Sequence, residues 1–356
     1  MQESLTEYFE DLDFCKALEF SQKKSRSGEF KKSYSSEFVR KVLRSWYQQN
    51  LVQGRLSDAL LSSFPPYPLQ LIQEEKQESE GLITRKFLWK LVDGATIETV
   101  CIPKSVNGKV SSTLCISSQL GCAMDCQFCR TGSMGLKRQL SHTEILAQVS
   151  NVMKRLPLDK IVFMGMGEPL HNFENLKLAI SQLVNADTFR ISGKNITVST
   201  SGLTPYIKRL GEECRVMLAV SLNASNNETR NRLMPINQKY PLEQLIESCR
   251  SYPSSNSRRI LFEYVMIDGV NDSIEDAHRV VELLKGIPSK VNLIPYNSSP
   301  EFHWKSSSME QIKRFREILL QGKVSTTLRS TRGEKMLGAC GQLKAKHESK
   351  KKRRLE

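Results

Sequence analysis

From about residue 111 onward, short apolar runs rich in β-branched residues alternate with longer segments of helical periodicity. The predicted strands are Thr113–Ser117, Lys160–Gly165, Asn195–Thr200, Val216–Leu222, Ile260–Ile267 and Val291–Pro295. The predicted helices are Glu144–Leu156, Phe173–Val184, Leu242–Tyr252, Ile274–Lys285 and Met309–Leu320. This alternation predicts parallel β/α units with right-handed crossovers. Six such units and a last strand at Ser325–Ser330 predict an α/β fold, an open partial (β/α)6 barrel rather than a closed eight-fold one.

The ends of the chain have a different pattern. Residues 1–90 are polar, and the stretch Glu37–Tyr47 has apolar positions three and four residues apart, which predicts an amphipathic helix. The prolines of Phe64–Pro68 break helices, and Glu74–Glu80 has the composition of a charged linker. We therefore predict a small helical accessory domain with a linker at 1–90, the barrel at 91–343 and a basic, disordered tail at 344–356. A hairpin of Lys86–Leu91 and Thr96–Ile102, turned at Asp93-Gly94, is expected to precede the barrel.

The charge balance indicates the kind of partner. There are 52 Lys and Arg residues against 38 Asp and Glu residues, which gives a net charge of +14. Such an excess favours a polyanion such as nucleic acid, although extra lysine is also a common route to solubility. No run approaches the roughly 18 apolar residues of a membrane helix, and the N-terminus is acidic, unlike a signal peptide. We expect a cytoplasmic protein with no membrane partner.

The nine cysteines are odd in number and unevenly spaced, which argues against a disulfide framework and for reduced thiols. Cys122, Cys126 and Cys129 follow the first predicted barrel strand with C-x3-C-x2-C spacing. Three thiolates on one loop can bind three irons of a [4Fe–4S] cluster and leave the fourth iron open to a small molecule. Structural zinc would need a fourth closed ligand, and no downstream pair of Cys or His supplies one. A metal cluster at the carboxyl end of a barrel strand also fits where catalytic loops lie.

This loop, with the aromatic Phe128 before its last cysteine, resembles the signature of the radical S-adenosylmethionine superfamily. The resemblance implies that the open iron binds S-adenosylmethionine through its amino and carboxylate groups. The reduced cluster then cleaves the sulfonium and releases a 5′-deoxyadenosyl radical.

A further set of segments resembles the RlmN/Cfr family of RNA methyltransferases over residues 96–343. In chain order they are Phe163–Leu170, Ser199–Gly202, Ser221–Asn223, Leu233–Asn237, Tyr264–Met266, Gly269–Asp272, Leu293–Asn297, Arg332-Gly333 and Ala339–Leu343. Gly167-Glu168-Pro169 and Arg332-Gly333 are nearer to the RlmN branch. The implied activity is methylation of C2 of adenosine in 23S rRNA at the peptidyl-transferase centre, with the adenosine next to the anticodon of tRNA as a second target. Two alternatives stay open: methylation at C8, as in Cfr, and an RNA-binding paralogue without catalysis.

The resemblance assigns catalytic roles to three residues outside the cluster loop. Cys340 would take a methyl group from one S-adenosylmethionine, and a second would provide the radical that activates this methyl group, so that each turnover uses two. Cys115 would resolve the protein–RNA adduct through a transient disulfide with Cys340, and Glu98 would remove the C2 proton. Taken alone, Cys115 is typical of a buried core thiol, and Glu98 of an exposed strand carboxylate.

The same resemblance implies the cofactor-binding residues. Gly167 and Glu168 would hold the amino group of S-adenosylmethionine, and Asn297 the nucleoside end. Ser199 and the segment Ser221, Leu222 and Asn223 would contact its carboxylate and ribose. Two positions depart from the family, Asn223 where His is usual and Arg130 where Ala is usual. Phosphate contacts are predicted for Lys137, Arg138, Arg230, Arg232, Arg258 and Arg259, and the expected partners of this monomer are the RNA and a one-electron reductant such as flavodoxin.

Overall fold

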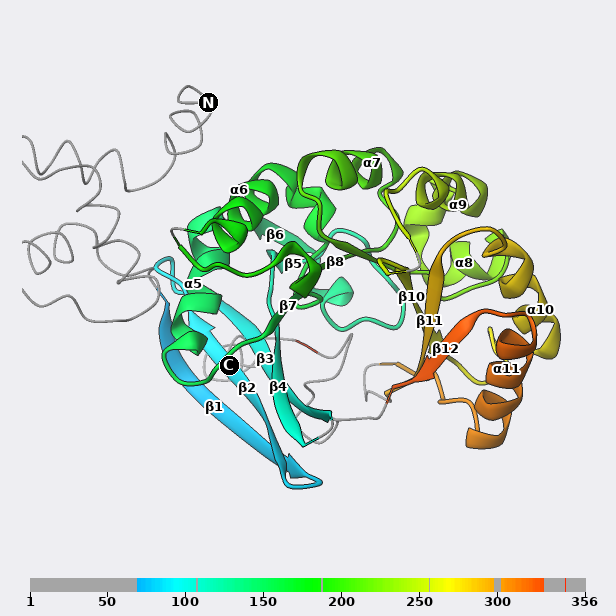
Figure 1. Cartoon of the computed structure of the whole chain (residues 1–356), viewed down its shortest axis with the longest axis horizontal. Coiled ribbons are helices and arrows are strands. Elements are labelled where there is room, and N and C mark those ends of the chain that lie inside the picture. Colours follow the sequence, from blue (N-terminus) through cyan, green and yellow to red (C-terminus); the bar gives the residue numbers. More distant parts are fainter. Residues whose placement is uncertain are drawn as a thin grey trace, which may run out of the picture.

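The computed structural model describes residues 69–106, 108–186, 188–255, 257–297, 302–329 and 343. Ten described strands form one sheet in the order β1-β2-β3-β4-β7-β8-β9-β10-β11-β12 (Figure 1). Its antiparallel part consists of β1 (Gln70–Ser79), β2 (Leu82–Lys90), β3 (Thr96–Val106) and β4 (Lys109–Cys115). Its parallel part continues from β4 through β7 (Lys160–Phe163), β8 (Ile196–Thr200), β9 (Met217–Ser221), β10 (Ile260–Met266), β11 (Ser289–Pro295) and β12 (Ser325–Leu328). The sheet is open, because β1 and β12 are not paired with each other.

Helices connect the parallel strands and cover the convex side of the sheet (Figure 1). They are α5 (His142–Met153), α6 (Phe173–Val184), α7 (Thr204–Glu213), α8 (Asn227–Leu233), α9 (Leu242–Arg250), α10 (Ile274–Leu283) and α11 (Met309–Gln321). The predicted α/β fold, with six β/α units and a final strand, is confirmed. Helices α7 and α8 were not predicted, and a two-stranded sheet of β5 (Gln119–Gly121) and β6 (Leu136–Gln139) flanks the cysteine loop.

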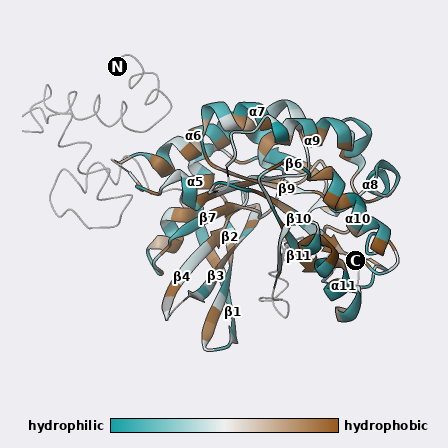
Figure 2. Cartoon of the chain, turned by 45° about the vertical axis from the view of Figure 1, so that its right-hand side comes forward, coloured by the Kyte–Doolittle hydropathy of each residue, from teal (hydrophilic) through white to brown (hydrophobic). Residues whose placement is uncertain are grey.

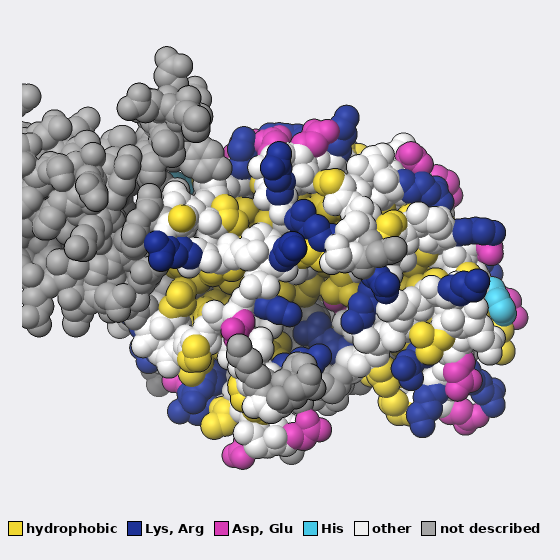
Figure 3. Space-filling view, in the orientation of Figure 1, with side chains coloured by type: hydrophobic (Ala, Val, Ile, Leu, Met, Phe, Trp, Pro, Cys, Tyr) yellow, Lys and Arg dark blue, Asp and Glu magenta, His cyan; other side chains and the backbone are white. Residues whose placement is uncertain are grey.

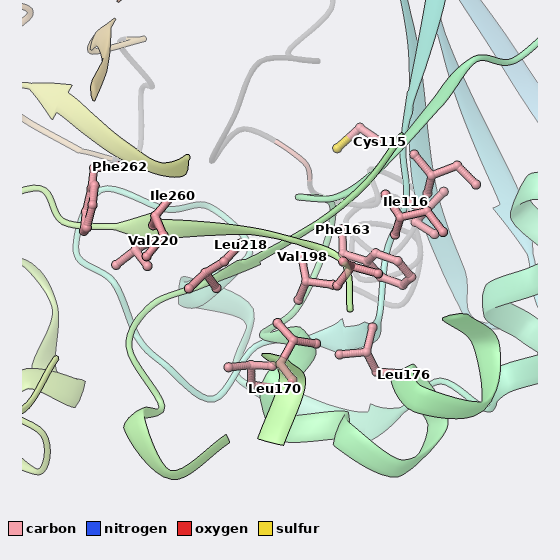
Figure 4. Close-up of a cluster of buried hydrophobic side chains, with 14 of the residues drawn as sticks. Cys115, Ile116, Phe163, Leu170, Leu176, Val198, Leu218, Val220, Ile260 and Phe262 are labelled. Carbon is pink, nitrogen blue, oxygen red and sulfur yellow. The ribbon is translucent and has the colours of Figure 1, made fainter. Parts of the chain in front are cut away.

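The two faces of the parallel strands have different compositions. Residues facing the helices, such as Phe163, Val198 and Phe262, are almost completely buried and form one hydrophobic core (Figure 4). Their neighbours in the chain point to the other, concave side, because strand residues alternate between faces. In β8, for example, Ile196 and Val198 are buried while Thr197 and Ser199 are half-buried. Hydrophobic residues accordingly concentrate on the strands and on the helix sides that meet them (Figure 2). The concave face keeps polar groups available for a site.

The structure corrects the predicted boundary of the accessory domain. Residues 70–90 are two strands of the main sheet, so their assignment to a helical domain with a linker at Glu74–Glu80 is wrong. Their charges suit an edge strand, where one row of backbone groups faces solvent and charged side chains discourage further pairing. An ion pair between Glu74 of β1 and Arg85 of β2 also joins the two strands. The predicted hairpin at Asp93-Gly94 is confirmed as the β2–β3 connection.

Some predictions fall outside the part of the chain that the structure describes. These include the amphipathic segment Glu37–Tyr47, the catalytic candidate Cys340, the segment Arg332-Gly333 and the basic tail at 344–356. Within the described residues, none of the helices has the length and apolar character needed to cross a bilayer.

Candidate active site

A pocket of about 820 Å³, counted to its open mouth, lies at the carboxyl ends of the parallel strands. It brings together most of the residues that the sequence pointed to: Cys122, Cys126, Cys129, Gly167, Glu168, Ser199, Ser221 and Asn223. In α/β folds with parallel strands, ligands bind at this end, where the loops that follow the strands converge. The predicted cluster loop and the predicted cofactor segments therefore share one cavity.

The cysteine loop is held by backbone hydrogen bonds to its surroundings. The Cys122 N–H donates to the carbonyl of Gly135 at 3.0 Å, and the Gln127 N–H donates to that of Leu233 at 2.9 Å. Burial raises the pKa of Cys122 to about 12, and burial together with the neighbouring cysteines raises that of Cys126 well above its ordinary value. Because burial makes these thiols hard to ionise, a cationic ligand must stabilise their thiolates, so cluster binding must release protons.

The three thiols form a donor set that fits a [4Fe–4S] cluster. In the described residues, no group of three or more His, Cys, Asp or Glu side chains surrounds a position for one metal ion. The three thiols are instead distributed along the wall of the same pocket. In a [4Fe–4S] cluster each thiolate binds a different iron, so a shared pocket wall is the arrangement that such a cluster needs.

Glu168 lines the pocket, is almost completely buried and accepts hydrogen bonds at both carboxylate oxygens. Its Oε2 accepts hydrogen bonds from the Ser201 N–H at 2.7 Å and the Ser201 hydroxyl at 2.8 Å, and its Oε1 accepts from the Leu170 N–H at 3.1 Å. Burial raises the pKa of this carboxyl, and the hydrogen bonds from Ser201 and Leu170 counteract the rise. A fixed carboxyl beside the cysteine loop is suited to an ammonium group. Its contact to the amino group of S-adenosylmethionine stays a prediction.

The other predicted cofactor residues differ in how they face the pocket. Ser199 and Ser221 line it from the ends of β8 and β9, whereas Leu222 is fully buried and is not among the lining residues. Asn297 does not line the pocket either, but its buried Oδ1 has no hydrogen-bond partner among the described residues. A buried carbonyl oxygen without a partner is costly, which makes it a fitting acceptor for a ligand.

Asn223 departs from the family and has a structural reason to be asparagine. Its backbone is left-handed, with φ of 54°, a conformation that asparagine tolerates better than most residues. Its Oδ1 accepts a hydrogen bond from the Val265 N–H at 2.9 Å, and its Nδ2 lies 3.3 Å from the sulfur of Met234. Asn223 therefore joins the ends of β9 and β10 while it lines the pocket.

Arg230 was predicted to contact phosphate, and this is wrong. The side chain is completely buried and donates to the carbonyls of Ser201, Ser221 and Leu222 and to Oδ1 of Asn237. Burial lowers the pKa of Arg230 to about 10, which still leaves it charged at neutral pH, near Cys126. The residue ties together the loops that follow β8 and β9, and it places a fixed positive charge near Cys126.

Cys115 and Glu98 lie on the same, concave face of the sheet. Cys115 is opposite Val162 of β7 and Val100 of β3 in the strand register, and Glu98 is two residues from Val100. Cys115 is 8% exposed, and Figure 4 shows it on the opposite side of the strands from Leu170 and Leu176. Glu98 is 3% exposed, so the exposed strand carboxylate expected from its neighbours alone is wrong. It is buried because β3 is an interior strand and Lys86 of β2 neutralises its charge.

Comparisons with known proteins agree on the family. The Radical SAM superfamily matches residues 116–283. The "Dual-specificity RNA methyltransferase RlmN 2" of Myxococcus xanthus is 49% identical over 279 residues, which cover 76% of this chain and 72% of that protein. The "Dual-specificity RNA methyltransferase RlmN" of Geobacter sulfurreducens is 48% identical over 263 residues, 74% of this chain and 72% of that protein. The chain belongs to the RlmN family.

A solved structure supports the radical SAM fold. A radical SAM methyltransferase from Sphaerobacter thermophilus has a TM-score of 0.82 and 37% identity, and the match covers 93% of this chain and 98% of that one. Membership means that the protein uses a [4Fe–4S] cluster and S-adenosylmethionine, as its resemblance implied. The pocket described above is where three thiols and a fixed carboxyl fit this pair of groups.

One pocket residue of this RlmN-family chain escaped the sequence reasoning. Glu263 of β10 lines the pocket, is 7% exposed and accepts a hydrogen bond from Asn292 of β11 at 2.8 Å. Burial raises the pKa of Glu263. The signal was present as a single carboxylate within the apolar run Ile260–Met266, which a purely structural strand would rarely carry.

Proposed function

We propose that this protein methylates C2 of adenosine in 23S rRNA at the peptidyl-transferase centre and in tRNA next to the anticodon. The observation that carries the proposal is the joint placement of the three cluster cysteines and Glu168 around one pocket, with Cys115 and Glu98 on the same concave face. The names of the relatives, dual-specificity RNA methyltransferases, support the two classes of RNA.

In this proposal the chain's residues first hold and orient two groups. Cys122, Cys126 and Cys129 bind the cluster, while Glu168, Ser199 and Asn297, which lie at the ends of three different parallel strands, hold S-adenosylmethionine. When bound, the pair supplies one-electron chemistry that can activate a methyl group. The buried walls of the pocket exclude water from a reactive radical.

Cys340 is the proposed methyl carrier and Cys115 the resolving thiol. The Cys340 thiolate would accept a methyl group as a nucleophile, and this S-methyl group would lose one hydrogen atom to the radical before its carbon bonds to C2 of the adenine. The adduct would then give up one electron and the C2 proton. The Cys115 thiolate would attack the Cys340 sulfur and break its bond to the methylene carbon, which would keep the electron pair and take a proton to become the methyl group of the released base. The disulfide between Cys115 and Cys340 would be returned to thiols by two electrons from the reductant. The position of Cys115 at the end of β4, on the concave face beside the pocket strands, supports this role.

Glu98 is the proposed base for the C2 proton. A base must remove this proton because C2 exchanges a bond to hydrogen for one to carbon. Glu98 lies on the same face as Cys115 and is 3% exposed. Its Oε1 lies 3.5 Å from Nζ of Lys86.

The proposed partners follow from the charge and the chemistry. Lys and Arg side chains are spread over the face shown in Figure 3, several of them around its central hollow, as a phosphate backbone would require. The target base must leave its stack to reach a pocket between strand ends. We also propose that the protein acts as a monomer in the cytoplasm and receives electrons from a one-electron donor such as flavodoxin, since the chemistry consumes electrons.

The test is mass spectrometry of nucleosides from rRNA and tRNA after anaerobic incubation with the loaded enzyme, reductant and methyl-deuterated S-adenosylmethionine. Labelled 2-methyladenosine supports the proposal and shows which RNA is used. Labelled 8-methyladenosine overturns it in favour of Cfr-like chemistry. No labelled base, despite cofactor cleavage, would overturn the proposal and point to a different substrate or to a paralogue that has lost this one.

Two cysteine variants test the roles of the thiols. Cys340→Ala should abolish methylation, while Cys115→Ala should accumulate a covalent protein–RNA adduct that is visible on a denaturing gel. Cys249→Ala is the matched control, because that thiol is buried in the helix-side core and should be dispensable for the chemistry. Methylation by Cys340→Ala, or free release of product by Cys115→Ala, would contradict the assigned roles.

A further inference from the structure

A small hydrophobic cluster, separate from the main core, packs against the cysteine loop. Its buried members are Leu233, Met234, Ile267 and Tyr296. Cys126 and Phe128 of the cysteine loop pack against them. Tyr296 comes directly after β11, and Ile294, two residues earlier, lines the pocket. Tyr296 therefore lies at the pocket end of the sheet, within the cluster that supports the cysteine loop.

Hydrogen bonds fix the cysteine loop to this cluster. The Gln127 N–H donates to the carbonyl of Leu233, as described above. Trp304, which also packs against the cluster, donates from Nε1 to the Gln127 carbonyl at 3.1 Å. Both backbone groups of Gln127 are thus held, so the position of the loop relative to Tyr296 is set by packing and by hydrogen bonds.

The hydroxyl of Tyr296 is the unusual group in this cluster. Tyr296 is 5% exposed, and its hydroxyl is buried without a hydrogen-bond partner among the described residues. Two other buried tyrosines have an acceptor: the Tyr252 hydroxyl donates to the Val216 carbonyl at 2.8 Å, and that of Tyr264 donates to the Asn271 carbonyl at 2.7 Å. A buried donor without an acceptor costs free energy, which a phenylalanine in the same space would avoid. The hydroxyl of Tyr296 therefore suits an acceptor other than the described side chains and carbonyls.

The electrostatics of Tyr296 point to one neighbour, Cys129. Burial raises the pKa of Tyr296, and the neighbouring Cys129 thiol raises it further. A phenol that keeps its proton can donate a hydrogen bond to an anionic sulfur. A thiolate that binds iron is such an acceptor, and hydrogen bonds to the sulfurs of an iron–sulfur cluster help to set its reduction potential.

We propose that the Tyr296 hydroxyl donates a hydrogen bond to the Cys129 sulfur when the [4Fe–4S] cluster is bound, and that this bond makes the cluster easier to reduce. Reduction adds negative charge that spreads onto the cluster sulfurs, so a hydrogen-bond donor there stabilises the reduced form more than the oxidised form. The inference deepens the proposed function, because it rests on the assignment of Cys129 as a cluster ligand. It makes no assumption about the RNA.

Tyr296→Phe removes the hydroxyl and keeps the ring. We expect the equilibrium constant for one-electron reduction of the cluster to fall by about tenfold, which is a shift of about 59 mV to a more negative potential. In the resonance Raman spectrum of the oxidised cluster, the stretching band of the terminal iron–cysteine bonds should move to higher frequency, because the lost hydrogen bond no longer weakens the bond from iron to Cys129. The bands of the bridging sulfides should stay in place.

The experiment is a potentiometric titration of the reconstituted, full-length protein, followed by the electron paramagnetic resonance signal of the reduced cluster. S-adenosylmethionine and RNA are left out, so that neither contributes to the potential, and the affinity for S-adenosylmethionine is measured separately. Tyr252→Phe is the matched control, because it also removes a buried tyrosine hydroxyl but one whose acceptor is the Val216 carbonyl.

The outcomes separate this inference from the function it rests on. A negative shift for Tyr296→Phe but not for Tyr252→Phe, with a moved terminal band, supports the hydrogen bond to Cys129. An unchanged potential overturns it, and so does a loss of affinity for S-adenosylmethionine alone. A shift carried by the bridging-sulfide bands overturns the choice of Cys129 as acceptor. Full cluster loading of Cys129→Ala, measured as iron content, would instead remove the ligand assignment, whatever Tyr296→Phe does.

Discussion

Gly167 is a position where the backbone and its neighbours both require glycine. Its φ is +101°, and a Cβ there would lie 2.5 Å from Cβ and 2.8 Å from the backbone nitrogen of Gln119. Gly167→Ala should therefore lower the free energy of unfolding by about 2–3 kcal/mol and displace the adjacent Glu168. Chemical denaturation measures the first effect. The control is Gly94→Ala, where φ is +83° but the space is open, and an equal loss there would show that the close approach to Gln119 contributes nothing.

Arg230 provides a second prediction for a single residue. Arg230→Met would leave the carbonyls of Ser201, Ser221 and Leu222 without their donor, so we expect a loss of about 3–5 kcal/mol in the free energy of unfolding. Arg232→Met on the same helix removes an exposed charge and should cost less than about 0.5 kcal/mol. Similar costs for the two variants, measured by denaturant unfolding, would contradict a bridging role for Arg230.

The sequence predicts single residues well when the signal is local. The three cluster cysteines are within one short loop, and their spacing alone indicates a metal cluster. The burial of Glu98 depends instead on Lys86, which lies on another strand. The burial of Arg230 depends on backbone carbonyls such as that of Ser201, and every residue has such a carbonyl, so no sequence pattern marks it. Lys86 becomes the partner of Glu98 only through the register of β2 on β3, which the sequence does not specify.

At the scale of elements, α10 offers a prediction about pH. Burial disfavours ionisation of Asp276 at the start of this helix, but hydrogen bonds from Ser225, Ser273 and Arg279 outweigh it and lower its pKa. A folded-state pKa below the unfolded value of about 3.9 stabilises the protein above that pH, and the contribution is lost as the pH falls through the folded pKa. Wild-type stability should thus fall more steeply below about pH 4 than that of Asp276→Asn, as measured by denaturant unfolding. Parallel curves would refute this account.

The prediction of elements succeeded where periodicity was long and uninterrupted. Helix α6 was predicted with the bounds that the structure has, and α9, α10 and α11 differ by two residues or fewer at each end. Helix α7 was missed because Pro205 and Gly211 are typical helix breakers, although proline is well tolerated in the first turn. Strand β1 was missed because an edge strand needs no apolar face, so its charged residues indicated a linker.

The whole molecule carries a net charge of +14, which leads to a prediction about salt. If binding neutralises about four phosphates of an unstacked RNA segment, a fourfold increase in salt should weaken binding by about fifty-fold. Fluorescence anisotropy with a labelled RNA hairpin measures this dependence, and binding of S-adenosylmethionine serves as a control that neutralises no phosphate. Affinity for RNA that does not change with salt would show that the basic surface is only a solubility feature.

The open sheet has a consequence for how a large substrate reaches the chemistry. In a closed barrel, strand pairs would have to break before a polynucleotide could approach the interior. With all its strand pairs intact, such a barrel would admit only small molecules. Here β1 and β12 are two separate edge strands of the sheet. Among the described strands, none has to separate from its neighbour to admit a base that is still attached to the RNA. The energetic barrier to entry then belongs to the RNA, which must unstack one nucleotide, and targets with a loosely stacked adenosine should be modified first.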